Sequence, residues 1–188
     1  MTWYEFLLFV HVTCAVIWLG GGFVLQVYGM TVERGGDPDE MAQFAGRAGH
    51  LGERLFVPTA LIVVLAGVGL VLEGNWTWGR LWIVFALVAY GVSFALGVGV
   101  LTPLAKKLPT VGPATPEGQA LIRRIFAVLR VDLVLLFSIV FAMTVKPTGD
   151  DLWTVVIAGA IAAALAAVLW VRTSRAPSPE ASVAPTGA

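Results

Sequence analysis

The sequence predicts an all-α membrane protein, a bundle of five transmembrane helices with one additional amphipathic helix on the cytoplasmic side. Hydrophobic residues make up 58% of its 188 residues and charged residues only 13%, which is not the composition of a soluble domain. A helix needs about 20 apolar residues to cross a bilayer core of roughly 30 Å. Five stretches meet this requirement, residues 6–30, 55–72, 81–104, 125–145 and 152–171. They form a single domain, 1–172, and a tail at 173–188 that we expect to be disordered.

Charge and cysteine content exclude several classes of protein. Twelve basic and twelve acidic residues leave no net charge, so nothing indicates a nucleic-acid partner. The single cysteine, Cys14, excludes an internal disulfide and a zinc site built from cysteines. No nucleophile motif and no phosphate-binding loop is found, so the sequence assigns no enzymatic class.

The distribution of Lys and Arg predicts the orientation in the membrane. Nine lie in the segments expected on one side, namely Arg34, Arg47, Arg54, Lys106, Lys107, Arg123, Arg124, Arg172 and Arg175. The other side has only Arg80 and Lys146, so the positive-inside rule places the N-terminus outside the cell membrane and the C-terminus in the cytoplasm. Aromatic residues that favour the headgroup level gather at the expected outer interface, as Trp3, Tyr4, Trp76, Trp78, Trp82 and Trp153.

Helix start signals precede several of these stretches. Asp37 followed by Pro38 predicts the start of an amphipathic helix that leads into the second span, with a bend at Pro58. Its apolar stripe is Met41, Phe44, Ala45, Ala48, Leu51 and Leu55, and its polar stripe is Gln43, Arg47, His50 and Arg54. Thr115 gives the same signal before the fourth span, and Asp150 with Asp151 before the fifth.

Small residues at fourfold spacing suit close helix packing. They are Gly91, Ala95 and Gly99 in the third span, and Gly159 and Ala163 in the fifth. Besides the lipid bilayer, the sequence therefore allows a second copy of the chain or another membrane protein as a partner.

His11 is the first candidate for chemistry, because it lies about 12 Å inside the first helix. Its helical face continues through Cys14, Ala15, Trp18, Gly22 and Gln26. A surface opened by Gly22 and walled by Trp18 could admit a porphyrin such as haem b, with the neutral imidazole as axial ligand. The alternative is a histidine that hydrogen-bonds a neighbouring helix.

Asp132 in the fourth span is the second candidate. A carboxyl group at this depth must face the bundle, either paired with a donor or handling protons. The candidate donors are His11, Tyr90, Ser93 and Arg54. We expect Arg130 to extend to the cytoplasmic surface and His50 to be solvated.

Copper(I) handling is a third possibility, since soft ligands are present. His11 and Cys14 lie one helical turn apart, and Met30, Met41 and Met143 supply dispersed thioethers.

Three segments in this order resemble the integral membrane proteins grouped as domain of unknown function family 2269. They are the opening stretch 6–21, the second-span segment 54–67, and Asp132 followed by the stretch 143–147. The resemblance covers roughly residues 3–148 and implies a multi-pass membrane protein.

More distantly, the chain is similar to the copper-resistance D membrane domain and to the J-type haem-bound protoporphyrinogen oxidase. The oxidase resemblance implies that His11 is a haem ligand. A basic residue that is lysine in the oxidases falls at Arg80, which stays charged, cannot ligate a metal and would lie near an anionic group such as a propionate. Three hypotheses follow: a haem-binding or redox protein, a non-catalytic scaffold or accessory subunit, and a copper-handling protein.

Overall fold

A computed structural model describes residues 1–151 and residue 159, and the regular elements in this part are all helical. Its longer helices are α1 (Trp3–Gly35), α2 (Pro38–Leu51), α3 (Val57–Glu73), α4 (Leu81–Leu96), α5 (Thr102–Val111) and α6 (Pro116–Val145). Two π-helical segments, η1 (Gly52–Phe56) and η2 (Gly97–Leu101), and one 3₁₀ turn, η3 (Gly149–Asp151), complete the described elements.

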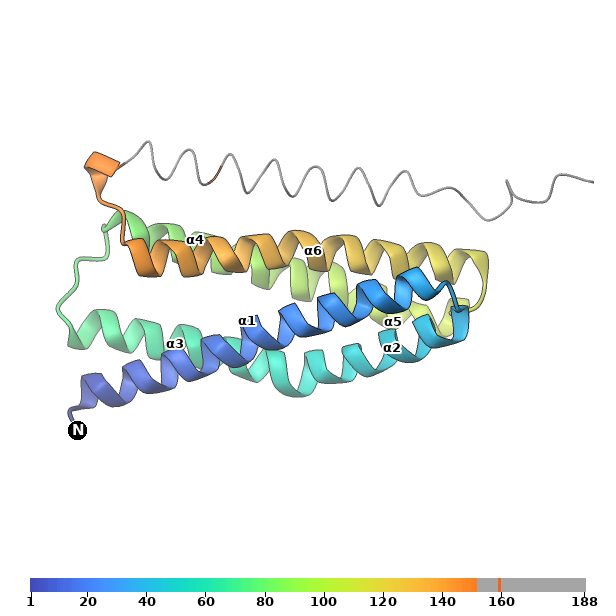
Figure 1. Cartoon of the computed structure of the whole chain (residues 1–188). Coiled ribbons are helices and arrows are strands. Elements are labelled where there is room, and N and C mark those ends of the chain that lie inside the picture. The colour runs from blue at the N-terminus through green and yellow to red at the C-terminus, as the bar shows by residue number, and fades with distance from the viewer. Residues whose placement is uncertain (152–158, 160–188) are drawn as a thin grey trace, which may run out of the picture.

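Four continuous helical stretches in the described residues are long and apolar enough to cross a membrane (Figure 1). They are Trp3–Gly35, Pro38–Glu73, Leu81–Val111 and Pro116–Val145. The first four expected spans are therefore present, each within a longer helical stretch. The fifth expected span, 152–171, and the tail at 173–188 lie outside the described residues, apart from Gly159.

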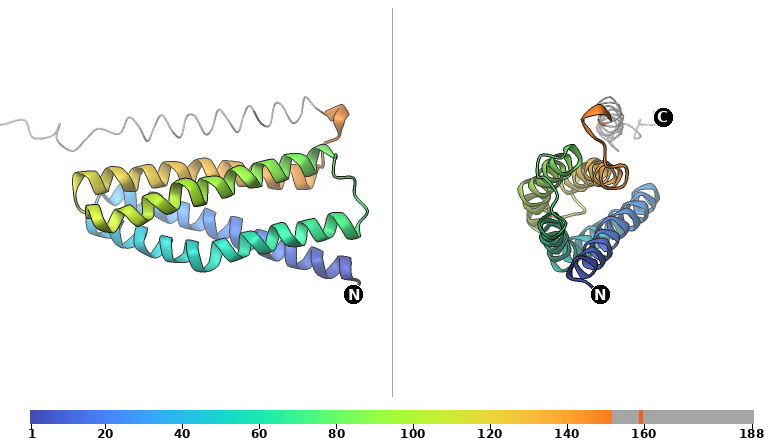
Figure 2. Two further views of the ribbon diagram at one scale, coloured as in Figure 1. Left: turned by 180° about the vertical axis from the view of Figure 1, so that it is seen from behind. Right: turned by 90° about the vertical axis from the view of Figure 1, so that its left-hand side faces the viewer.

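The four stretches pack as two pairs. α1 lies along α3, α4 lies along α6, and the pairs meet mainly through α1 and α6. The views in Figure 2 show the same two pairs from behind and from one end. The end that holds the N-terminus and the α3–α4 connection is called here the Trp76 end, and the opposite end, with α2, α5 and the start of α6, the Phe44 end.

The amphipathic helix α2 begins as the sequence predicts. The Asp37 side chain accepts hydrogen bonds from the backbone N–H groups of Asp39 and Glu40, at 2.9 and 3.4 Å. Met41 and Phe44 are buried, while His50 is exposed. The apolar side of α2 therefore closes the Phe44 end over a cluster of Val32, Met41, Phe44, Leu108, Ile122 and Phe126.

Two prolines explain the two π-helical segments. Pro58 is the second residue of α3 and follows η1, and Pro103 is the second residue of α5 and follows η2. A proline has no N–H to donate, and its ring crowds the carbonyl group four residues earlier, so the wider π turn relieves the contact. A π-helical segment thus lies directly before Pro58, where the sequence predicts a bend, and a second one lies directly before Pro103. The bend itself stays a prediction.

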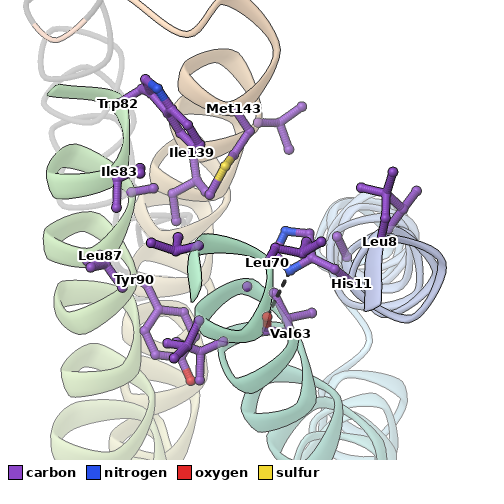
Figure 3. Close-up of a pocket in the computed structure, with 18 of the residues that line it drawn as sticks. Leu8, His11, Val63, Leu70, Trp82, Ile83, Leu87, Tyr90, Ile139 and Met143 are labelled. Carbon is purple, nitrogen blue, oxygen red and sulfur yellow. Dashed lines mark hydrogen bonds between the residues drawn. The ribbon is translucent and has the colours of Figure 1, made fainter. Parts of the chain in front are cut away.

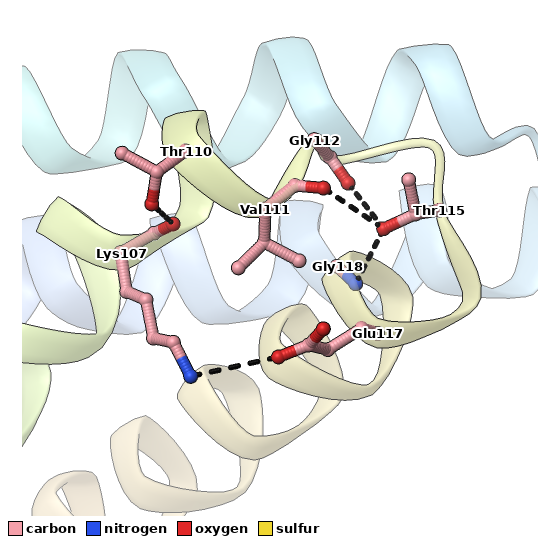
Figure 4. A network of polar contacts seen from close by, with 7 residues as sticks. All are labelled: Lys107, Thr110, Val111, Gly112, Thr115, Glu117 and Gly118. Atoms are coloured by element: carbon pink, nitrogen blue, oxygen red, sulfur yellow. Dashed lines mark hydrogen bonds and ion pairs between the residues drawn. The ribbon is translucent and has the colours of Figure 1, made fainter.

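The α5–α6 turn is held by Thr115, the expected N-cap. Its hydroxyl accepts from the Gly118 N–H at 3.0 Å and donates to the Gly112 carbonyl at 2.7 Å (Figure 4). Beside it, Lys107 and Glu117 form an exposed ion pair at 3.5 Å. Because α6 begins at this cap, it starts nine residues before the expected apolar span at 125–145.

The small residues of the third span are exposed in the described part of the chain. Gly91, Ala95 and Gly99 lie on the surface of α4 and η2, and a Cβ atom added at either glycine would meet nothing within 4 Å. Ala163, of the second pair of small residues, lies outside the described residues. A packing role for these residues stays a prediction.

Candidate functional site

A cavity of about 460 Å³ lies between the two helix pairs, toward the Trp76 end (Figure 3). All four long helical stretches contribute to its wall, and the wall is mostly aliphatic and aromatic. The polar side chains in the lining, apart from the tryptophans, are Tyr4, His11, Tyr90, Thr144 and Lys146. Size and lining are those of a site for an apolar small molecule oriented by a few polar groups.

His11 projects from α1 into this lining and bonds the neighbouring helix. Its Nδ1 lies 2.8 Å from the backbone carbonyl oxygen of Val63 on α3. Since a carbonyl can only accept, Nδ1 carries the proton and donates it. In the neutral ring Nε2 then keeps its lone pair, the form in which an imidazole ligates a metal.

A glycine on α3 makes room for the ring. A Cβ atom at Gly67 would lie only 3.1 Å from Cε1 and 3.3 Å from Nδ1 of His11. The position of the ring therefore depends on the absence of a side chain at Gly67. Helical periodicity on α1 could not reveal this residue, because it belongs to another helix.

Only part of the α1 face that the sequence predicts to continue from His11 lines the cavity. Ala15 and Trp18 line the cavity, and the Trp18 ring meets Tyr90 of α4 edge to face, with centroids 5.8 Å apart. The Tyr90 hydroxyl in turn donates to the Ala60 carbonyl at 3.3 Å. Gly22 and Cys14 are not among the lining residues.

The Trp76 end of the cavity carries two cations. The Arg80 guanidinium lies 4.6 Å from the centre of the Trp76 ring, and the Lys146 ammonium lies 5.1 Å from the same ring and 5.5 Å from Trp82. Trp76, Trp82 and Lys146 line the cavity, and Arg80 touches the lining through Trp76. The sequence singled out Arg80, but its meeting with Lys146 arises only in the fold.

Asp132 lies deeper in the bundle and faces α4. The Ser93 hydroxyl donates to its Oδ1 at 2.5 Å, and Ser93 is only 3% exposed. Of the four donors considered from the sequence, the fold brings Ser93 to the carboxyl group. Leu136, one turn further along α6, belongs to the cavity lining, whereas Ser93 and Asp132 do not. The pair therefore lies next to the cavity, on its side toward the Phe44 end.

The expectation that Arg130 extends to the surface was wrong. Its guanidinium forms an ion pair with Glu33 of α1, and its side chain is 14% exposed. Pairing within the bundle removes the need to reach water. The Gln26 amide is buried nearby on the same face of α1, without a hydrogen-bonding partner in the described structure.

The candidate copper ligands do not converge. Within residues 1–151, no group of three or more His, Cys, Asp or Glu side chains is placed to hold a metal ion. Cys14 is half-buried outside the cavity lining, and Met41 belongs to the cluster at the Phe44 end. Met143 is the methionine in the cavity wall (Figure 3).

Comparison with known proteins identifies a family. A family model described as "Predicted integral membrane protein (DUF2269)" matches residues 5–147, which span α1 through α6. No curated protein and no solved structure matches the chain.

Proposed function

The chain belongs to the DUF2269 family of predicted integral membrane proteins, and on this premise we propose that its cavity binds haem b, with His11 as an axial ligand. The chain is a multi-pass membrane protein, so an apolar cavity between its helices offers a site for a flat hydrophobic molecule within the bilayer.

The hydrogen bond from His11 to Val63 carries this proposal. A histidine that ligates a metal usually donates its other ring N–H to a carbonyl or carboxylate, which fixes the tautomer and the orientation of the ring. At His11 the 2.8 Å contact to the Val63 carbonyl provides this arrangement. The surrounding lining supports it, because a porphyrin body is apolar and the cavity excludes polar groups from most of its wall.

Each nearby residue has a distinct role in this proposal. His11 would hold the iron through Nε2, Val63 and Gly67 position the imidazole, and Trp18 with Tyr90 forms an aromatic wall. Bound haem supplies one-electron chemistry, and its potential depends on axial ligation and on the exclusion of water. The mostly apolar lining would limit the access of water to the porphyrin.

Absorbance spectra test the proposal. Protein purified in detergent from haem-replete cells should show a Soret band that changes on reduction with dithionite, and His11→Ala should abolish it. His50→Ala is the matched control, since His50 is exposed on α2 and should leave the spectrum unchanged. A wild type without a Soret band, or an unchanged spectrum in the His11 variant, would refute haem binding at this residue.

A non-catalytic scaffold is the second candidate, and the same hydrogen bond favours it. His11 links α1 to α3 through this hydrogen bond. In that case His11→Ala should lower the stability of the bundle without any spectral change. Of the two copper ligands that the sequence predicts one turn apart, His11 lines the cavity and Cys14 does not. A copper site in the cavity would therefore have His11 but not Cys14 as a ligand.

We propose that the Trp76 end faces outward from the cell membrane, on the nine-to-two distribution of Lys and Arg in the loops. With Cys14→Ser as background, Thr77→Cys and Ala114→Cys place one exposed thiol at each end. An impermeant maleimide should label Thr77→Cys in intact cells and Ala114→Cys only after lysis. The reverse pattern would invert the orientation.

A further inference from the structure

The two cations at the Trp76 end come from different parts of the chain and meet at one indole ring. Arg80 precedes α4, and Lys146 follows α6. Each lies over the Trp76 ring, at 4.6 and 5.1 Å, and that ring is part of the cavity wall. An ammonium has three N–H donors and a guanidinium has five, so each cation keeps donors for a ligand group beside its contact with the ring.

No carboxylate of the described residues forms an ion pair with these cations. The ion pairs in this part of the chain are Lys107–Glu117 and Arg130–Glu33, and neither involves Arg80 or Lys146. Four acidic residues of the described chain, Glu5, Glu73, Asp150 and Asp151, also lie at the Trp76 end, and two of them have hydrogen-bonding partners of their own. Glu5 accepts from the Thr2 N–H at 2.7 Å, and Asp151 accepts from Thr148 at 2.9 and 3.0 Å. These Thr148 hydrogen bonds lower the pKa of Asp151.

The first turn of α4 adds to the positive potential. Its N-cap is Arg80, and no side chain caps the helix there. The free N–H groups of a helix N-terminus carry partial positive charge, equivalent to about half an elementary charge. The apolar cavity therefore ends beside two cations and the uncapped N-terminus of α4.

We infer that the cavity takes an amphipathic ligand whose acidic group lies at the Trp76 end, between Arg80 and Lys146, while its apolar body extends toward His11. The guanidinium offers paired donors that match a carboxylate, and the ammonium offers a second charged contact. The inference rests on the proposed function for the identity of the body as a porphyrin. It adds the orientation of the porphyrin. The propionates lie at the Trp76 end of the cavity, beside Arg80 and Lys146, and this edge of the cavity is called here the rim.

Metal-free protoporphyrin IX tests the rim without involving iron ligation. Its binding to the full chain, in phosphatidylcholine nanodiscs with empty nanodiscs as blank, is followed by porphyrin fluorescence. The free diacid should bind about tenfold more tightly than its dimethyl ester, which has the same apolar body. In Arg80→Gln/Lys146→Gln that preference should disappear, with the ester affinity unchanged.

Two further variants separate the rim from general effects of charge and folding. Arg80→Lys/Lys146→Arg keeps both charges and should keep most of the preference for the diacid. Arg47→Gln/Lys106→Gln removes two exposed charges at the Phe44 end and should leave the preference intact. A loss in this control equal to that in the rim variant would overturn the assignment.

The porphyrin-binding experiment and the Soret-band experiment can fail independently of each other. Equal affinity of diacid and ester for the wild type, or no binding of either, would overturn the rim assignment even if His11→Ala abolishes a Soret band. A preference for the diacid that depends on Arg80 and Lys146 would sustain it even if His11 proves not to ligate iron.

Discussion

The Ser93 hydroxyl on α4 donates a 2.5 Å hydrogen bond to the carboxyl group of Asp132 on α6. It is a side-chain hydrogen bond between these two helices, in which Ser93 is buried and Asp132 is half-buried. The pair therefore links α4 to α6 next to the cavity, on its side toward the Phe44 end, and restricts the rotation of one helix against the other.

Removing this donor should destabilise the bundle. Ser93→Ala leaves Asp132 without the donor, and we expect the free energy of unfolding to fall by about 1 to 2 kcal/mol. Unfolding in detergent, followed by circular dichroism, measures the change. Ser138→Ala is the control, because Ser138 bonds the Val134 carbonyl of its own helix at 2.8 Å and should cost little. Equal stability of the two variants would contradict a role for the pair.

The ion pair between Glu33 and Arg130 should contribute more than an exposed pair. Glu33→Gln leaves a largely buried guanidinium without its counter-ion, at a cost of about 1 to 3 kcal/mol in unfolding free energy. Glu117→Gln breaks the exposed pair with Lys107 and should change stability by less than about 1 kcal/mol. Adding Arg130→Gln to Glu33→Gln should restore part of the loss, and a further loss of similar size would argue against an unpaired charge as the cause.

A methyl group at Gly67 should disturb the imidazole of His11. Because the added Cβ would lie 3.1 Å from Cε1, the ring must move away from the Val63 carbonyl or α3 must shift. We expect Gly67→Ala to weaken haem binding about tenfold, measured by titration of the Soret band. Gly91→Ala is the control, since its Cβ meets nothing within 4 Å. Unchanged affinity in Gly67→Ala would show that the ring position does not govern binding.

The helices could be predicted from the sequence because their signals are local. Apolar length, the cap at Asp37 and the cap at Thr115 depend on residues a few positions apart, and the helix starts at Pro38 and Pro116 follow from them. Asp132 could be placed in the bundle for a similar reason, since its depth alone makes exposure to lipid costly.

The contacts between helices could not be predicted in the same way. Glu33 and Arg130 are 97 residues apart, and nothing local to either indicates the other. The clearance at Gly67 depends on how α3 lies against α1, and the meeting of Arg80 with Lys146 depends on where two connections end in space. Single-chain periodicity shows which face of a helix is buried but not which helix covers it.

The π-helical segments determine how the helices on either side of them are rotated about the helix axis: η1 joins α2 to α3, and η2 joins α4 to α5. A π turn holds more residues than an α turn, so the apolar stripe of α2 is not the simple continuation of the stripe of α3. Deleting one residue from Gly52–Phe56 would allow a regular α-helix there and rotate α2 by about 100° relative to α3. Met41 and Phe44 would then turn away from Val32 and Ile122, which they now cover. The closure of the Phe44 end thus depends on the residue count of a segment that contributes no buried side chain of its own.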